Sequence, residues 1–265
     1  MQFMSIASGS SGNSYYVGTD RTTLLLDAGI SMKRIDDGLR TIDRSLDDVD
    51  GILITHEHID HIKGLGVISR KYNIPIYATY GTIDGIVASG ALGTFDFNLL
   101  QPIMNREEFM IGDIEIKAHS ISHDAADPVC YSFTSNGKKV SVATDMGVYD
   151  NMIIDFLSES DAMLIEANHD IRMLEVGPYP FPLKQRILSD RGHLCNEASG
   201  KLIRQLLNSH IKYIALGHLS DKNNYPELAY EAVRQELEGN IYSIDVRDFG
   251  LTVAPRERNG ELVKL

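Results

Sequence analysis

The sequence predicts an α+β architecture in which two mixed β-sheets pack together and are flanked by helices, an αββα sandwich. Stretches of clustered β-hairpins are interspersed with βα units, and this mixture does not fit a purely alternating parallel sheet. The chain has 265 residues, of which 43% are hydrophobic and 23% charged, close to the average of globular proteins. No low-complexity tract or fixed-period repeat interrupts it. We therefore expect residues 1–265 to form a single domain.

The first half of the chain begins with short strands separated by glycine and polar turns. We expect strands over 2–7, 14–18, 22–27 and 51–55, with a helix over 31–40 among them. Beyond residue 55 the apolar pattern predicts a helix over 61–72, a strand over 75–78, a helix over 82–89 and a run of strands from 109 through 144.

The second half alternates helices and strands more regularly. We expect helices over 151–157, 183–189, 196–208 and 226–238, and strands over 162–166, 213–217, 242–246 and 251–253.

Composition excludes several functional classes. The N-terminus has no basic segment followed by a sustained apolar stretch, and no later segment approaches the ~18 uninterrupted apolar residues of a membrane span, so we expect a soluble cytoplasmic protein without a membrane partner. Cys130 and Cys195 lack CxxC partners and predict two idle thiols rather than a disulfide or a zinc–thiolate site.

The net charge of -12 argues against a surface that is positive throughout. Between residues 172 and 204, however, the sequence contains six basic residues and only three acidic ones. We expect four of the basic residues to line a substrate groove, while a solvated helix face would explain the same bias. These four are Arg172, Lys184, Arg186 and Arg191.

Metal-binding residue types cluster in Thr-His-Glu-His-Ile-Asp-His, residues 55–61. The segment follows an apolar strand and opens a helix, a position from which functional side chains commonly project. In extended backbone His56 and His58 point to the same side and can bind one metal ion, and Asp60 and His61 can reach a second. This set of nitrogen and oxygen donors without thiolate suits Zn²⁺, Mn²⁺ or iron.

These residues resemble the metal-binding signature of the metallo-β-lactamase superfamily, and the resemblance implies that fold for the whole chain. It further assigns Asp27 to orienting the metal loop. The first metal would be held by His56, His58, His123 and Asp145, and the second by Asp60, His61, Asp145 and His218. His119 competes with His123 because both have the same parity along one strand; we prefer His123 because it ends the strand.

Within the superfamily the chain is similar to the YycJ (WalJ) group of bacterial proteins, whose relatives include the phosphodiesterases PhnP and RNase Z. The similarity is carried by Ala-Ser-Gly-Ser-Ser-Gly-Asn-Ser at 7–14, Thr-His-Glu-His at 55–58, Glu-Ala-Asn-His-Asp at 166–170, Gly-His-Leu-Cys-Asn-Glu-Ala at 192–198 and Gly-His-Leu-Ser at 217–220. Cys130 and Cys195 depart from the glycine and serine expected there. No long insertion is present that could form the tRNA-gripping arm of RNase Z, which disfavours tRNA processing.

The resemblance implies a metal-dependent phosphodiester hydrolase, a DNA nuclease of the 5′ to 3′ exonuclease type with nucleic acid as substrate. A hydroxide bridging two divalent ions would attack phosphorus, and Asp60 would orient it as well as bind metal. The Glu and His pair of RNase Z matches Glu166 and His193, which implies that His193 protonates the leaving oxygen.

Several alternatives stay open at this stage. The same ligands would serve a hydrolase of small phosphodiesters, a lactamase-like or glyoxalase-like hydrolase of amides or thioesters, or a non-catalytic binding module. Residues 9–13 form either a phosphate-binding nest or an ordinary tight turn. The sequence leaves undetermined the native metal, DNA against RNA, the polarity of degradation, the oligomeric state, and the roles of Asn168 and His169.

Overall fold

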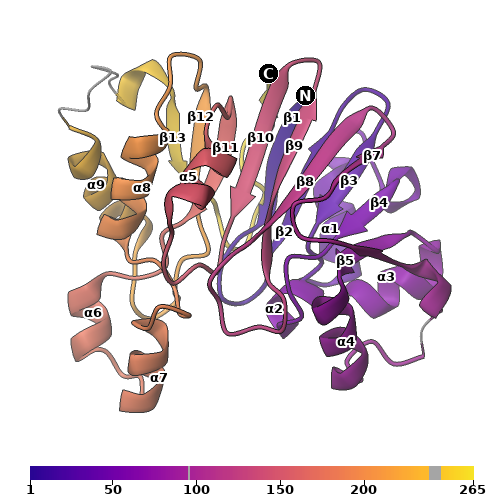
Figure 1. Cartoon of the computed structure of the whole chain (residues 1–265), viewed down its shortest axis with the longest axis horizontal. Helices are drawn as coiled ribbons and strands as arrows, with labels where there is room; N and C mark the ends of the chain where they lie inside the picture. The colour runs from indigo at the N-terminus through magenta and orange to yellow at the C-terminus, as the bar shows by residue number, and fades with distance from the viewer. Residues whose placement is uncertain (95, 239–245) are drawn as a thin grey trace.

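Two mixed β-sheets face each other in the computed structural model, which describes residues 1–94, 96–238 and 246–265 (Figure 1). Within these residues each sheet has seven strands, in the orders β14-β1-β2-β3-β4-β5-β6 and β13-β12-β11-β10-β9-β8-β7. In each sheet an antiparallel part continues into a parallel part, with the change at β3 in the first and at β10 in the second. The expected pair of mixed sheets is confirmed.

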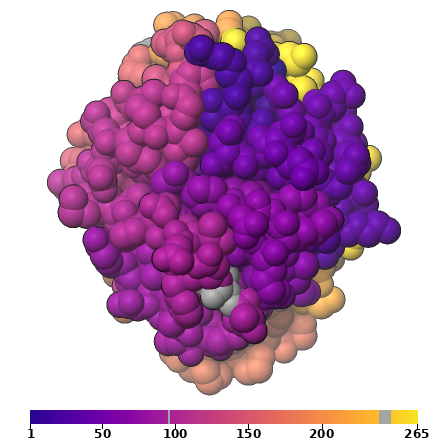
Figure 2. All heavy atoms as spheres, turned by 90° about the vertical axis from the view of Figure 1, so that its right-hand side faces the viewer, coloured from indigo at the N-terminus to yellow at the C-terminus, as the bar shows by residue number. Residues whose placement is uncertain are grey.

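The first sheet is built from the N-terminal half of the chain and completed by a short C-terminal strand. Its strands are β1 (Gln2–Ala7), β2 (Ser14–Gly18), β3 (Thr23–Leu26), β4 (Gly51–Leu53), β5 (Ile76–Thr79), β6 (Leu100–Ile103) and β14 (Val263–Lys264). The helical segments of this half are α1 (Met32–Arg40), η1 (Leu46–Asp48), α2 (Ile59–Ile62), α3 (Leu65–Tyr72), α4 (Tyr80–Ser89) and η2 (Phe97–Leu99). Figure 2 looks onto this side of the molecule, where the N-terminal half covers most of the surface.

The second sheet comes from the C-terminal half. Its strands are β7 (Glu108–Ile111), β8 (Ile114–Ser120), β9 (Val129–Ser135), β10 (Lys138–Ala143), β11 (Ala162–Glu166), β12 (Tyr213–Gly217) and β13 (Gly250–Val253). The accompanying helical segments are α5 (Asn151–Leu157), α6 (Ile171–Val176), α7 (Phe181–Ile187), α8 (Asn196–Leu206), α9 (Pro226–Leu237) and η3 (Val246–Asp248).

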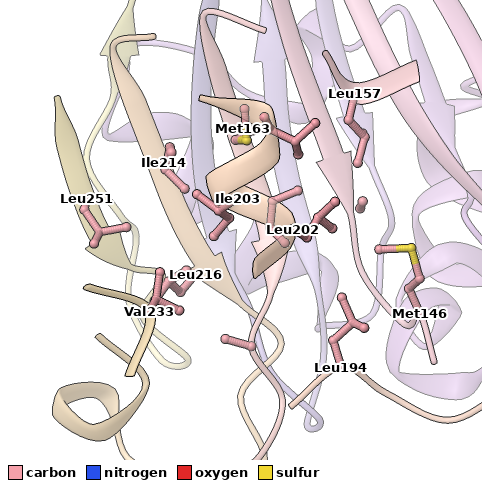
Figure 3. Close-up of a cluster of buried hydrophobic side chains, with 14 of the residues drawn as sticks. Met146, Leu157, Met163, Leu194, Leu202, Ile203, Ile214, Leu216, Val233 and Leu251 are labelled. Atoms are coloured by element: carbon pink, nitrogen blue, oxygen red, sulfur yellow. The ribbon is translucent and has the colours of Figure 1, made fainter. Parts of the chain in front are cut away.

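Alternation of side chains along the strands produces three apolar layers. Leu24 and Leu26 of β3 pack between the two sheets, whereas Leu25 packs outward against α1 and α3. On the second sheet Leu164 of β11 faces inward, and Met163 faces the layer covered by α5, α8 and α9 (Figure 3). Because a strand presents successive residues to opposite faces, apolar strands of this kind require a cover on each side.

The structure departs from the expected elements at a few places. The helix expected over 61–72 is divided into α2 and α3 at Gly64, whose N–H donates to the Ala28 carbonyl and whose Cα leaves no room for a Cβ, which would lie 2.2 Å from the Ile30 carbonyl oxygen. The strands β6 and β14 and the helix α6 were not expected. Of the strand expected over 242–246, residues 242–245 lie outside the described residues, and Val246 begins η3.

Three polar residues that follow the carboxyl ends of strands have the left-handed backbone conformation. Asp27 after β3, Asp145 just beyond β10 and His218 after β12 have φ angles of 60°, 60° and 53°. Left-handed backbone is uncommon outside glycine, and it occurs disproportionately at functional sites. These strand ends and α2 meet at one end of the sandwich, the lower edge in Figure 1. Among the helices of the described ranges, none has the length and apolarity that crossing a membrane requires.

Candidate metal centre

The loop after β4 brings four potential metal ligands to one point. His56 and His58 lie in the extended segment before α2, and Asp60 and His61 lie in its first turn. The rings of His56 and His61 are 4.1 Å apart between centroids, and those of His56 and His58 are 4.6 Å apart. The predicted clustering of this motif is therefore present in the structure.

The three ligands expected from distant segments join this loop. His123 Nε2 lies 3.3 Å from His58 Nδ1, although 65 residues separate them in the chain. His218 Nε2 lies 4.0 Å from an Asp60 oxygen. Among the described residues, donor atoms lie within 4.8 Å of one another in four sets. Three of them together contain all seven expected ligands: His56, His58 and His123; His56, His61 and Asp145; and Asp60, His61 and His218. The fourth contains Asp145, Glu166, His193 and His218.

Asp145 lies close to histidines from several of these sets. One of its oxygens, Oδ2, is 3.3 Å from His61 Nε2, and the other, Oδ1, is 3.3 Å from His218 Nε2 and 3.8 Å from His123 Nε2. Its side chain is almost completely buried. A single carboxylate can therefore reach a metal ion held by either group of histidines.

Two buried atoms of the cluster indicate that a divalent metal fits. Within the described part of the chain, His56 Nε2 and Asp145 Oδ2 are buried and have no hydrogen-bond partner, which is unusual for buried polar atoms. Burial, followed by repulsion from His61, holds the pKa of His56 well below its usual range. Burial by itself would raise the pKa of Asp145, but His218 and His61 hold it well below its usual range. Neutral imidazole and ionised carboxylate are the forms that bind metal.

Asp27 contacts the loop after β4 that carries the four candidate ligands. One of its oxygens accepts hydrogen bonds from the Thr55 backbone N–H and hydroxyl, and the other lies 2.7 Å from His61 Nδ1. Since a carboxylate only accepts, Nδ1 of His61 carries a proton, which leaves Nε2, the nitrogen that faces Asp145, as the one that could bind a metal. This agrees with the role that the family resemblance assigned to Asp27.

Asn13 is a site residue that the sequence did not single out. It is fully buried, and its Nδ2 lies 3.1 Å from His61 Nε2 while its Oδ1 lies 3.3 Å from His218 Nδ1. It lies in the loop that could have been a phosphate nest, but the N–H groups of Gly9, Gly12 and Asn13 donate to acceptors within the protein. The loop therefore positions Asn13 instead of offering those three N–H groups to an anion.

Glu166 and His193 form the pair expected from the sequence. Glu166 is fully buried; its Oε1 lies 2.6 Å from His193 Nδ1, and its Oε2 accepts from the backbone N–H of Met146. Burial alone would lower the pKa of His193, but attraction by Glu166 and their hydrogen bond raise it to about 9. His193 Nδ1 is also 3.7 Å from Asp145 Oδ1. An imidazole whose protonated form is favoured by Glu166 thus lies beside the cluster of candidate ligands.

The remaining candidates lie apart from the ligands or support them. His119 packs against Phe156 and donates from Nδ1 to the Ser120 carbonyl, whereas His123 is in the cluster. Asn168 Nδ2 donates to the His218 carbonyl and lines the cavity described below. Burial lowers the pKa of His169 to about 4.

Neither cysteine has the environment of a reactive thiol. Burial raises the pKa of the Cys130 thiol to about 12, and it also raises that of Cys195. Both thiols are free in the structure. A reactive cysteine instead has a lowered pKa.

A cavity of about 200 Å³ opens above the cluster. It is lined by Ser10, His58, Asp60, His123, Asp124, Asp145, Asn168, Tyr179, Leu183, Arg186, Ile187, Gly192, His193, His218 and Ser220.

Of the four basic residues expected in a groove, Arg186 alone is among the cavity-lining residues. Arg191 Nε donates to the His123 carbonyl, and Lys184 Nζ donates to the Glu175 carbonyl. Arg186 pairs with both oxygens of Asp124, whose Oδ1 lies 3.4 Å from His123 Nε2. The other three are not among the residues that line this cavity.

Comparison with known proteins identifies similar sequences that cover most of the chain. A sequence model described as "Beta-lactamase superfamily domain" matches residues 22–212. The chain is 42% identical over 247 residues to "Exodeoxyribonuclease YycJ" of Bacillus anthracis, covering 92% of each chain. It is 43% identical over 232 residues to "Exodeoxyribonuclease WalJ" of Streptococcus pneumoniae, covering 88% of this chain and 86% of the relative.

Solved structures show the same fold at much lower identity. The metallo-β-lactamase fold protein YhfI from Bacillus subtilis superposes with a TM-score of 0.72 at 15% identity, over 98% of each chain. A diphosphatase of the PhnP family and human tRNase Z, short form, superpose with TM-scores of 0.66 and 0.65 at 17% and 16% identity, each over the whole of this chain and at least 99% of the other. The predicted fold is thereby confirmed.

Proposed function

Since this chain belongs to the β-lactamase superfamily, we propose that it is a two-metal phosphodiesterase that degrades DNA from the 5′ end. The observation that carries the proposal is the placement of a Glu-bound histidine beside the seven side chains that are expected to bind metal. The identity of more than two residues in five to curated exodeoxyribonucleases, along nearly the whole of both chains, supports DNA as the substrate.

Two groups of side chains would hold the metals, which are divalent Zn, Mn or Fe. His56, His58 and His123 would hold the first ion together with Asp145. Asp60, His61 and His218 would hold the second, again with Asp145. When bound, such a pair of ions activates water as a nucleophile and neutralises the charge that develops on the phosphoryl oxygens.

The protein's own groups fix the geometry of this centre. Asp27 holds the ring of His61 through Nδ1, and Asn13 holds the ring of His218 through Nδ1. In both rings Nε2 would be the nitrogen that binds metal. Asp60, which is partly exposed to the cavity, would both bind metal and orient the attacking nucleophile by accepting a hydrogen bond from it. Arg186 at the cavity wall would bind a phosphate oxygen of the substrate.

His193 would supply the proton that the leaving oxygen needs. Because Nδ1 donates a hydrogen bond to Glu166, the other ring nitrogen, Nε2, is the one available to a substrate in the cavity. Glu166 favours the protonated form of this ring because its charge and hydrogen bond raise the pKa of His193. A hydrolase of amides or thioesters would use the same metal ligands but would not call for this pair.

Digestion of end-labelled DNA and RNA, single-stranded and double-stranded, in the presence of Zn²⁺, Mn²⁺ or Fe²⁺ tests the proposal. We expect progressive release of nucleotides from the 5′ end of DNA. Parallel assays with bis(p-nitrophenyl) phosphate, a thioester and a β-lactam distinguish the alternatives. Turnover of the thioester or the lactam without any of the phosphodiesters would contradict the proposed function, and endonucleolytic or 3′ products would contradict the polarity.

A further inference from the structure

Helices α6 and α7 form a hairpin that projects beyond the sheets at the end where the ligands lie (Figure 1). In Figure 2 the salmon-coloured part of the chain emerges at the lower edge of the molecule. The hairpin contributes Tyr179, Leu183, Arg186 and Ile187 to the cavity above the ligands. This wall of three apolar side chains and one cation is not needed to hold metal.

We propose that this wall, built from Tyr179, Leu183, Arg186 and Ile187, binds the single nucleotide next to the scissile phosphate, with its base against Tyr179. The inference rests on the proposed function and names the part of the substrate that the hairpin recognises. The residues of α7 involved are spaced at i, i+3 and i+4, so they lie on one face of the helix. Phe181 and Leu188, at other positions on this segment, are exposed to solvent instead.

The size of the cavity favours one nucleotide over a length of chain. Its volume of about 200 Å³ lies below the ~300 to 1,000 Å³ that drug-sized ligands occupy. The wall provides an aromatic ring for a base and a guanidinium for a phosphate. Stacking on an aromatic side chain tolerates every base because each has a π-face, as degradation of arbitrary DNA requires.

Tyr179 is held by its neighbours in the chain. It lies between Pro178 and Pro180, so its own backbone is restricted to extended conformations and that of each neighbour is fixed in φ. Gly177, just before, has no room for a Cβ, which would lie 2.5 Å from both Asn223 Oδ1 and the Met173 carbonyl oxygen. Because its backbone is restricted in this way, Tyr179 loses little backbone freedom when a base stacks on its ring.

The wall is also connected to the catalytic groups. The backbone N–H of His193 donates to the Ile187 carbonyl at 3.0 Å. Gly192 lies so close to the same oxygen that a Cβ on it would be 2.1 Å away. Arg186 pairs with Asp124, next to the candidate ligand His123. A base on the wall would therefore be held at a fixed distance from both the candidate acid and the ligands.

The test compares two single-stranded DNA oligonucleotides that differ at the nucleotide flanking the first phosphodiester to be cleaved. One has a normal base there, and the other has an abasic tetrahydrofuran nucleotide. We expect wild-type protein to cleave the normal substrate with a kcat/KM at least about tenfold higher, the difference lying mainly in KM, because base–aromatic stacking is typically of that strength.

The variants locate the effect. Tyr179→Ala should bring the ratio of the two kcat/KM values close to one, and Tyr179→Phe should preserve it because the ring is retained. Phe181→Ala is the matched control: this aromatic residue is on the same hairpin, 69% exposed and outside the cavity, so the ratio should not change.

Two results would overturn the inference while leaving the proposed function intact: wild-type protein that degrades both oligonucleotides equally well, or Tyr179→Ala protein that still discriminates between them. Wild-type protein that contains metal but cleaves neither DNA nor bis(p-nitrophenyl) phosphate would remove the proposed function, and this inference with it.

Discussion

Asp27 Oδ2 and His61 Nδ1 lie 2.7 Å apart, and both side chains are fully buried. The carboxylate fixes which nitrogen of His61 carries the proton, and its second oxygen accepts from the backbone of Thr55 at the start of the ligand loop. Asp27 therefore positions both the ring of the candidate ligand His61 and the loop that carries four candidate ligands.

Replacing Asp27 by Asn should weaken the second metal site. Asn tolerates the left-handed backbone at this position, but its amide NH₂ must face either Thr55 N–H or His61 Nδ1–H, both of which are donors. Loss of such a supporting contact typically costs about 10- to 100-fold in metal affinity. Titration with Zn²⁺ against a competing chelator measures it, with Asp20→Asn, an exposed carboxylate, as control. An unchanged Zn²⁺ affinity of the second metal site would contradict the orienting role of Asp27.

Substitution of Asp145 should affect both metal ions. Asp145 lies close to histidines of both proposed metal sites. Asp145→Asn, a substitution that also tolerates a φ of 60°, should therefore reduce the metal content from two ions per chain to one or none and abolish hydrolysis. Elemental analysis of metal-supplemented protein provides the measurement, and His119→Ala serves as control because His119 lies outside the cluster. Wild-type protein that is fully active with one ion would rule out the two-metal proposal.

The candidate ligands could be proposed from the sequence because one compact motif and the family resemblance point to them. His56, His58, Asp60 and His61 form one compact motif, and Asp145 and His218 each follow an apolar strand that is easily recognised. Parallel strands bring their carboxyl ends to one edge of a sheet, so residues far apart in the sequence were expected to meet. The fold followed from the same apolar patterns.

Residues whose roles depend on tertiary contacts could not be predicted in this way. Asn13 lies in a serine- and glycine-rich segment that reads as a turn, and its contacts with His61 and His218 span 48 and 205 residues. Asp124 acquires its partner Arg186 62 residues later. Of the missed elements, α6 has six residues and β14 two, which is too short for a periodic pattern to show.

Arg186 should contribute to DNA binding, whereas Lys184 should not. Arg186 lines the cavity, while the Lys184 ammonium donates to a carbonyl of α6. Arg186→Gln should weaken binding of single-stranded DNA and reduce the slope of log affinity against log salt by about 0.7, the value for one phosphate contact. Fluorescence anisotropy at several salt concentrations tests this, with Lys184→Gln as the matched control. Equal slopes for Arg186→Gln and wild type would place the phosphate contact elsewhere.

Asp113 should stabilise the fold in a pH-dependent manner. It links the turns between β2 and β3 and between β7 and β8, and hydrogen bonds from Thr22 and Thr19, together with Arg21, lower its pKa from 3.8 to about 2. A depressed pKa means that the ionised form favours the folded state, so this stabilisation is present above pH ~4 and is lost as the pH falls from about 4 to about 2.

The corresponding experiment is a comparison of unfolding temperatures of wild-type protein and Asp113→Asn across this range. The gap between them should be constant from pH 7 to pH 5 and should close below pH 4. A gap that does not depend on pH would show that Asp113 acts through packing alone.

The contact between Glu166 and His193 leads to a prediction that depends on the leaving group. A general acid matters only where the leaving oxygen is strongly basic, and it typically contributes ~10² to 10⁴ in rate. The leaving group in DNA cleavage is a sugar alkoxide, which is strongly basic. The leaving group of bis(p-nitrophenyl) phosphate is p-nitrophenolate, which departs without protonation. If His193 is the acid, its loss should distinguish the two substrates.

We expect His193→Ala to slow DNA cleavage by ~10² to 10⁴ and to leave the hydrolysis of bis(p-nitrophenyl) phosphate nearly unchanged. Glu166→Gln should show the same selectivity in weaker form, because the neutral amide no longer favours the charged imidazolium whose pKa Glu166 raises. The measurement is kcat/KM for both substrates at equal metal content, which must be checked first because His193 also lies 3.7 Å from Asp145. Equal losses on the two substrates would mean that His193 positions the substrate or supports a ligand and does not transfer the proton.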